Sequence, residues 1–90
     1  MYKLHLHRDA QKALQKAQKR IQKKAFLCLQ HLRNQGPYGL PFPLKMLEGH
    51  YRKLRYLEAK IDKDYRIIFR VEEDAVFIRY AGTHNALGTG

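Results

Sequence analysis

The sequence predicts an α+β domain in which a helical hairpin packs on a small, mostly antiparallel twisted sheet. Two observations predict this fold. Residues 10–34 contain no proline or glycine, and three later runs are rich in β-branched and aromatic residues. The expected order is one strand, two helices and three strands. A chain of 90 residues has room for one domain with a single modest core, so we expect residues 1–90 to form one unit.

The first half of the chain contains the first strand and both helices. Apolar side chains at every second position of Tyr2–His7 predict a strand. A helical region follows, for which Asp9 is the expected N-cap. Apolar residues from Leu14 onward recur at helical spacing. Because one straight helix of this length would be long for so small a domain, we expect a break between Gln18 and Arg20.

The second half of the chain predicts a connector and an antiparallel meander. Glycine and proline in residues 36–43 end the helix and favour an extended connector. Polar segments at residues 60–64 and 72–74 separate the runs with strand character. The three expected strands are Tyr51–Ala59, Tyr65–Val71 and Val76–Tyr80.

One face of this meander is expected to be basic. Arg66 and Arg70 alternate with apolar residues in the second strand, and Arg79 does so in the third. Successive strand side chains point to opposite faces, so the apolar face would meet the helices and the arginines would lie opposite. The last strand leads into Gly-Thr-His, which places the imidazole of His84 beside the basic face.

Composition limits the class of partner. The chain has 18 lysines and arginines against 8 acidic residues, a formal charge of +10. Such an excess indicates nucleic acid, an anionic membrane surface or an acidic protein as partner. No apolar run is long enough to span a membrane, and none resembles a signal peptide. The only cysteine, Cys28, lies among apolar residues, as expected of a buried thiol in the cytoplasm.

Three segments carry a family resemblance: residues 47–55, 64–71 and 79–87. Together with the basic helical pair, they resemble the RelE/ParE superfamily, the small toxins of type II toxin–antitoxin pairs. The strand Asp-Tyr-Arg-Ile-Ile-Phe and the ending Gly-Thr-His-x-x-Leu are similar to those of the YafQ-like branch, whose members are ribosome-dependent mRNA endonucleases. The resemblance implies the fold described above, the ribosome and mRNA as partners, and a cognate acidic antitoxin that wraps and silences the toxin.

The resemblance also implies roles for individual residues. His84 matches a catalytic acid or base, and Asp64 matches an aspartate of the branch's site. Arg66 matches the strand arginine that relatives use on the scissile phosphate. Lys60 stands where the branch has a second histidine, and we expect it to assist catalysis. The residues expected to bind RNA or phosphate are Lys53, Arg55, His50, Tyr51, Arg70 and Arg79.

The implied chemistry needs no metal and no other cofactor. RNA supplies its own nucleophile, the 2′-OH, so cleavage needs a base, cations for the developing negative charge, and an acid for the 5′-oxygen. Histidine suits the proton transfers, because its ordinary pKa is near 6.5, and arginine suits the phosphate, because its guanidinium donates paired hydrogen bonds. One cysteine gives no zinc pattern, and His5, His7 and His31 are not spaced like metal ligands.

Two other functions are consistent with the sequence. A ParE-like toxin would poison DNA gyrase without cleaving RNA, and a non-catalytic relative would only bind RNA or the ribosome. The Gly-Thr-His ending favours the nuclease. Gly88, where the branch has an aromatic residue, keeps the non-catalytic interpretation open. The helix lysines predict either a solvated surface or contact with structured RNA; they are Lys12, Lys16, Lys19, Lys23 and Lys24.

Overall fold

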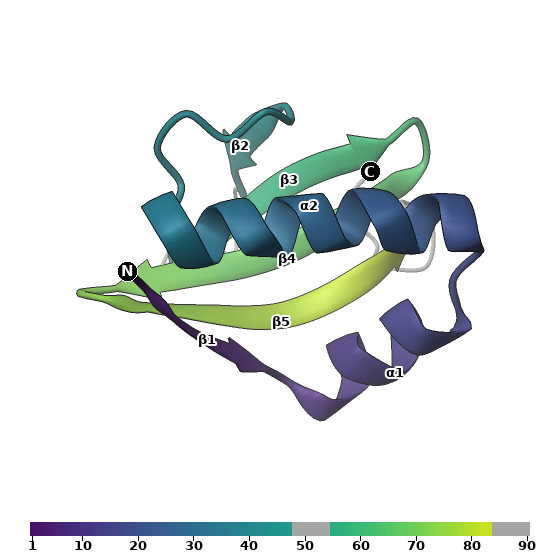
Figure 1. The fold of residues 1–90 in the computed structure, drawn as a ribbon, viewed down its shortest axis with the longest axis horizontal. Coiled ribbons are helices and arrows are strands. Elements are labelled where there is room, and N and C mark those ends of the chain that lie inside the picture. Colours follow the sequence, from purple (N-terminus) through teal and green to yellow (C-terminus); the bar gives the residue numbers. More distant parts are fainter. Residues whose placement is uncertain (48–54, 84–90) are drawn as a thin grey trace.

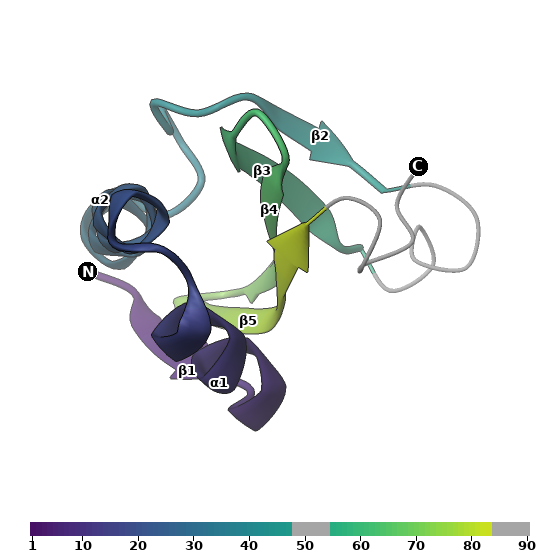
Figure 2. The same ribbon diagram turned by 90° about the vertical axis from the view of Figure 1, so that its right-hand side faces the viewer.

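The structure, a computed structural model, describes residues 1–47 and 55–83. In chain order its elements are β1 (Lys3–Leu6), α1 (Arg8–Lys16), α2 (Lys19–Gln35), β2 (Leu44–Met46), β3 (Leu57–Asp62), β4 (Tyr65–Glu72) and β5 (Ala75–Thr83). Within these residues the strands form one sheet in the order β1-β5-β4-β3-β2. Both helices lie on the same side of this sheet (Figures 1 and 2). The predicted α+β class is confirmed.

The sheet is a meander with one added strand at each edge. Strands β3, β4 and β5 pair antiparallel, as expected. The first strand, whose partner the sequence did not indicate, lies parallel to β5. The expected connector contributes an additional short strand, β2, which pairs antiparallel with β3. This pairing occupies the hydrogen-bonding edge that β3 would otherwise expose to solvent.

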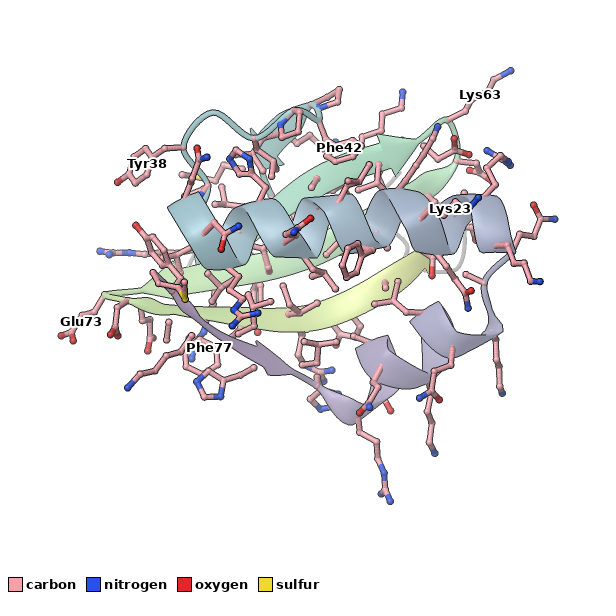
Figure 3. The ribbon with its side chains drawn as sticks, viewed as in Figure 1. Lys23, Tyr38, Phe42, Lys63, Glu73 and Phe77 are labelled. Atoms are coloured by element: carbon pink, nitrogen blue, oxygen red, sulfur yellow. The ribbon has the colours of Figure 1, made fainter. Side chains whose placement is uncertain are left out.

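The boundaries of β3 differ from the expected strand Tyr51–Ala59. Residues 51–54 lie outside the described part of the chain, and the strand begins at Leu57 because Arg55 has φ +59° in a turn. At its other end β3 continues to Asp62, so only Lys63 and Asp64 form the turn into β4. The expected polar break is therefore mostly strand. Lys63 and Glu73 mark the two hairpin turns, at opposite ends of the sheet (Figure 3).

The helical region divides where the sequence predicts. Residue Ala17 is extended, and Gln18 is the N-cap of α2. The prediction that Asp9 is the N-cap of the first helix is wrong. His7 is the N-cap of α1, and its Nδ1 accepts a hydrogen bond from the Asp9 N–H at 3.1 Å. Asp9 instead lies in the first turn of α1, where its charge favours the helix dipole.

The core lies between α2 and the sheet. Helix α2 lies over β4, roughly along the strands (Figure 1), and buries one stripe of side chains: Ile21, Ala25, Cys28 and Leu32. They pack in one cluster with Ile67 and Phe69 of β4, which are fully buried. Phe26, expected on the apolar stripe, is 65% exposed, because it is rotated about 100° from Ala25 around the helix.

Asp62 ties the β3–β4 hairpin to α2. Its carboxylate accepts hydrogen bonds from Lys24 Nζ and Arg20 Nη1, each at 2.7 Å. These two hydrogen bonds lower the pKa of Asp62 from 3.8 to about 2, and the bond from Lys24 has the larger effect. The sequence indicated only a polar break here, so this ion-pair cluster was not predicted.

The Asp62 cluster predicts a specific acid sensitivity. Because the folded-state pKa lies below the ordinary value, the stabilisation is complete above about pH 5 and is lost as the pH falls toward about 2. Urea unfolding across this window should show a smaller loss of stability in Asp62→Asn than in the wild type. Asp64→Asn is the matched control, since Asp64 forms no ion pair within residues 1–47 and 55–83. An unchanged pH dependence in Asp62→Asn would contradict the prediction.

Gly36 ends α2 in a conformation that only glycine adopts easily. Its φ is +70°, and its N–H donates to the Leu32 carbonyl at 2.9 Å. A Cβ at this position would lie 2.5 Å from Cζ of the Tyr2 ring. Gly39 has a similar φ of +68° but open space around it.

Alanine substitutions at Gly36 and Gly39 distinguish the energetic cost of backbone strain from that of a steric clash. Gly39→Ala should lower the free energy of unfolding by about 1 kcal/mol, the cost of a left-handed alanine. Gly36→Ala should cost about 1–3 kcal/mol more, because the ring of Tyr2 must move out of its packing. Denaturant unfolding of both variants measures the difference, and equal losses would show that the contact with Tyr2 carries no energy.

Candidate functional site

Four charged side chains converge on the sheet face opposite the helices. Lys45 of β2 lies opposite Glu58 of β3, and Lys60 of β3 lies opposite Arg66 of β4. Arg66 alternates with Ile67, which faces the core, so it points away from α2. The four residues line a hollow of about 230 Å³, together with Pro43 and Leu44.

Arg66 is held firmly in this hollow. The sequence predicts a basic face here, where an arginine would be expected to be exposed, yet Arg66 is only 8% exposed. Its Nε donates to Glu58 Oε1 at 3.1 Å, and its Nη1 lies 3.4 and 3.5 Å from the carbonyl oxygens of Asp62 and Lys63. Arg66 therefore lies on the predicted face of the sheet. It is buried there because the β3–β4 hairpin supplies acceptors around the guanidinium.

Sequence reasoning missed Glu58 and Lys45. Glu58 is 3% exposed, and its Oε1 lies 3.7 Å from Lys45 Nζ as well as bonding Arg66. Its Oε2 is buried and has no hydrogen-bond partner within residues 1–47 and 55–83. The sequence does contain a signal: Glu58 precedes Lys60 by two residues, which places both on one strand face. A carboxylate on that otherwise basic face could have been singled out.

The remaining predicted catalytic residues lie at the same end of the sheet or outside the described chain. Asp64 is exposed in the β3–β4 turn. On the other side of Arg66, its partner in the sheet is Gly82 of β5, and Tyr65 pairs with Thr83. His84 follows Thr83 in the sequence and lies outside the described residues, as do Lys53, His50 and Tyr51.

Arg70 and Arg55 are separated from this cluster. Arg70 is four residues from Arg66 on one strand, a distance of roughly 13 Å. Its guanidinium is 5.3 Å from the centroid of the Phe77 ring, and its Nη1 is 3.3 Å from Glu72 Oε1. Both arginines line a second hollow of about 780 Å³, whose other charged residues are Glu72, Glu73 and Asp74.

Arg79 lies in a third environment, which it shares with neither Arg66 nor Arg70. The register of β4 with β5 shifts between Ile68 and Phe69, and Arg79 is the extra residue of this irregularity. Its guanidinium lies over the Tyr80 ring, 4.2 Å from the centroid, and 3.9 Å from the Asp9 carboxylate. The three arginines expected on one face therefore have three different environments.

Cys28, on α2, is buried in the hydrophobic core of the domain. Burial raises the pKa of its thiol to about 12, so the thiolate is absent near neutral pH. Within residues 1–47 and 55–83, no group of three histidine, cysteine, aspartate or glutamate side chains could hold a metal ion. None of the helices formed by these residues is long and apolar enough to cross a membrane.

The burial of Cys28 predicts an unreactive thiol. At about pH 8, a disulfide reagent such as dithiobis(nitrobenzoic acid) should modify the folded protein at least about 100-fold more slowly than the unfolded protein in denaturant. The absorbance of the released thiolate measures the rate. Rapid modification of the folded chain would show that the thiol is accessible.

Comparison with known proteins supports the fold. No protein-family model matches the sequence, and no curated protein matches it. YafQ from E. coli strain BL21(DE3) has a TM-score of 0.79 at 20% identity, covering 97% of this chain and 98% of that chain. A chain of the E. coli DinJ-YafQ toxin–antitoxin complex has a TM-score of 0.77 at 22% identity, with 96% of each chain covered.

An archaeal structure gives the same result. A chain of the RelB-RelE antitoxin–toxin complex from Methanococcus jannaschii has a TM-score of 0.76 at 18% identity, covering 92% of this chain and 93% of that chain. The likeness extends over nearly the whole length in each case. The fold expected from the sequence is therefore confirmed, because the chain has the fold of the YafQ and RelE toxins.

Proposed function

We propose that this chain is the toxin of a type II toxin–antitoxin pair and an endoribonuclease that cleaves mRNA on the ribosome. The observation that carries the proposal is the cross-strand pair of Lys60 and Arg66 beside Lys45, in a hollow on the sheet face opposite the helices. Three cations around one small hollow suit a phosphodiester, which carries a single negative charge. The fold shared with YafQ and RelE is consistent with this proposal.

The proposed reaction is metal-independent attack of the RNA 2′-OH on the adjacent phosphate. His84 transfers protons, and Arg66 and Lys60 stabilise the negative charge that develops on the phosphorane. Asp64, in the turn beside them, orients a neighbouring cation or the imidazole. The pairing of Arg66 with Gly82 supports this division of roles, because His84 follows Gly82 by two positions in the sequence. The products are a 2′,3′-cyclic phosphate and a 5′-hydroxyl.

Ribosomal RNA is the proposed docking partner of the helices. Their exposed lysines include Lys12, Lys16, Lys19 and Lys23. Lys24, which belongs to the same sequence pattern, is committed to Asp62. The other lysines supply an electrostatic footprint for RNA phosphate. Positioning by the ribosome would compensate for a low intrinsic rate, because correct orientation alone supplies several kcal/mol.

The proposed protein partner is an acidic antitoxin. Solved relatives with this fold occur in complexes with DinJ and with RelB. The net charge of +10 favours an acidic partner here too. Because the proposed substrate is mRNA on translating ribosomes, the cytoplasm is the proposed compartment.

Cleavage of mRNA on programmed ribosomes, with mapping of the product ends, tests this function. The wild-type chain should cut in the ribosomal A site and leave 5′-hydroxyl ends. Arg66→Ala and His84→Ala should each lower the cleavage rate by about 10²–10³-fold, because each removes a group that acts in the transition state. Lys3→Ala removes an exposed cation of the edge strand β1, outside both helices and the hollow; it is the matched control and should cleave normally.

The outcomes separate the competing functions. No cleavage by folded wild-type protein on ribosomes would refute the nuclease, and gyrase poisoning would be assayed next. Ribosome binding without cleavage would identify a non-catalytic relative. Cleavage that survives both substitutions would retain the enzyme class and exclude His84 and Arg66 from its mechanism.

A further inference from the structure

We propose that Glu58 is a positioning residue, whose buried carboxylate holds the Arg66 guanidinium in the orientation that a phosphodiester requires. This inference rests on the proposed function and adds a residue that the family resemblance does not assign. It also adds Lys45, which the same carboxylate attracts, to the cations around the hollow. Glu58 acts through Arg66, and the substrate touches Arg66.

The contacts of Arg66 define its orientation from two elements. Glu58 of β3 accepts from Nε at 3.1 Å, and the carbonyl oxygens of Asp62 and Lys63 lie 3.4 and 3.5 Å from Nη1. A guanidinium is planar, so fixing Nε and one terminal nitrogen fixes the plane of the whole group. An unconstrained arginine side chain would instead sample many rotamers and would lose entropy on meeting a phosphate.

Charge explains why a carboxylate is needed here. Lys45, Lys60 and Arg66 all line one hollow of about 230 Å³, where they repel one another in the absence of substrate. The Glu58 carboxylate lies within 4 Å of two of these cations and lowers that repulsion. Among the described residues that line it, one carboxylate stands against three cations, so the hollow remains positive and an incoming phosphodiester is still attracted.

A purely structural role for Glu58 is the competing explanation. Buried ion pairs often contribute no more stability than apolar residues of the same volume. In addition, Glu58 Oε2 is buried and has no hydrogen-bond partner among the described residues, which costs free energy. Stability alone is thus a weak reason for a carboxylate at this position, whereas the direct bond to Arg66 gives it a defined task.

A double-mutant cycle on ribosome-bound mRNA tests the proposal. Glu58→Met removes the acceptor while keeping the volume, and kcat should fall by about 10–100-fold with little change in KM, as expected when a catalytic group is misplaced. In an Arg66→Ala background the same substitution should cause no further loss. Glu58→Gln, which keeps an acceptor oxygen for Nε, should retain more activity than Glu58→Met.

Two controls distinguish positioning from stability. Gly36→Ala, whose added Cβ meets the Tyr2 ring at the end of α2, should lower stability while leaving kcat unchanged. All rates are compared at a temperature where each variant is folded. A Glu58→Met variant with normal kcat, or with a loss that adds fully to that of Arg66→Ala, would overturn the proposal. If Glu58→Met does not fold, Glu58→Gln in the same cycle decides between the same outcomes.

A second measurement does not depend on cleavage. In ¹⁵N-labelled wild-type protein, the Arg66 Nε–H should give a resolved signal that exchanges slowly with water, because Glu58 accepts this proton. The signal should exchange at least about tenfold faster in Glu58→Met. Slow exchange that persists in this variant would overturn the positioning role. An inactive wild type with a protected Nε–H would refute the proposed function and leave the contact itself confirmed.

Discussion

The pairing of β4 on both of its sides fixes the rest of this structure. β3 and β5 are each aligned to β4, and β2 and β1 are aligned in turn to those strands. Ile67 and Phe69 of β4 are fully buried beneath the helical layer. Because side chains alternate along a strand, this packing forces Arg66 onto the opposite face. The register then places it between Lys60 and Gly82. The core therefore positions the candidate site, and slipping β4 by one residue would invert both.

A chain with so few acidic residues uses two of them where cations converge. Asp62 joins Arg20 and Lys24 of α2 to the end of β3. Glu58, four residues earlier on the same strand, joins Arg66 to Lys45 on the other side of the sheet. The self-repulsion expected from a charge of +10 is thus offset at the two points where helix, hairpin and edge strand meet.

The sequence predicted those features that depend on local periodicity. The alternation in β4 and the helical division near Gln18 were confirmed, whereas the alternation in β5 breaks at Arg79, after which Ala81 rather than Tyr80 joins the core. The segments around Arg66 and His84 indicated the fold that the comparisons support. What depends on tertiary contact was missed. The start of β3 depends on the turn at Arg55 with positive φ, and its end on cross-strand pairing of polar residues. Glu58 looked like an ordinary strand residue because its partners come from β2 and β4.

The charge distribution indicates which end of the β4 face is suited to phosphate. Around Arg70, the second hollow holds two arginines against three carboxylates, and Glu72 already neutralises Arg70. Around Arg66, the described residues place three cations beside one carboxylate. An anion is therefore attracted to the Arg66 end, although the sequence shows arginines at both. That end is also where β5 finishes at Thr83, next in sequence to His84. The residue proposed for proton transfer and the cations proposed to bind phosphate therefore belong to neighbouring parts of the chain, as the proposed mechanism requires.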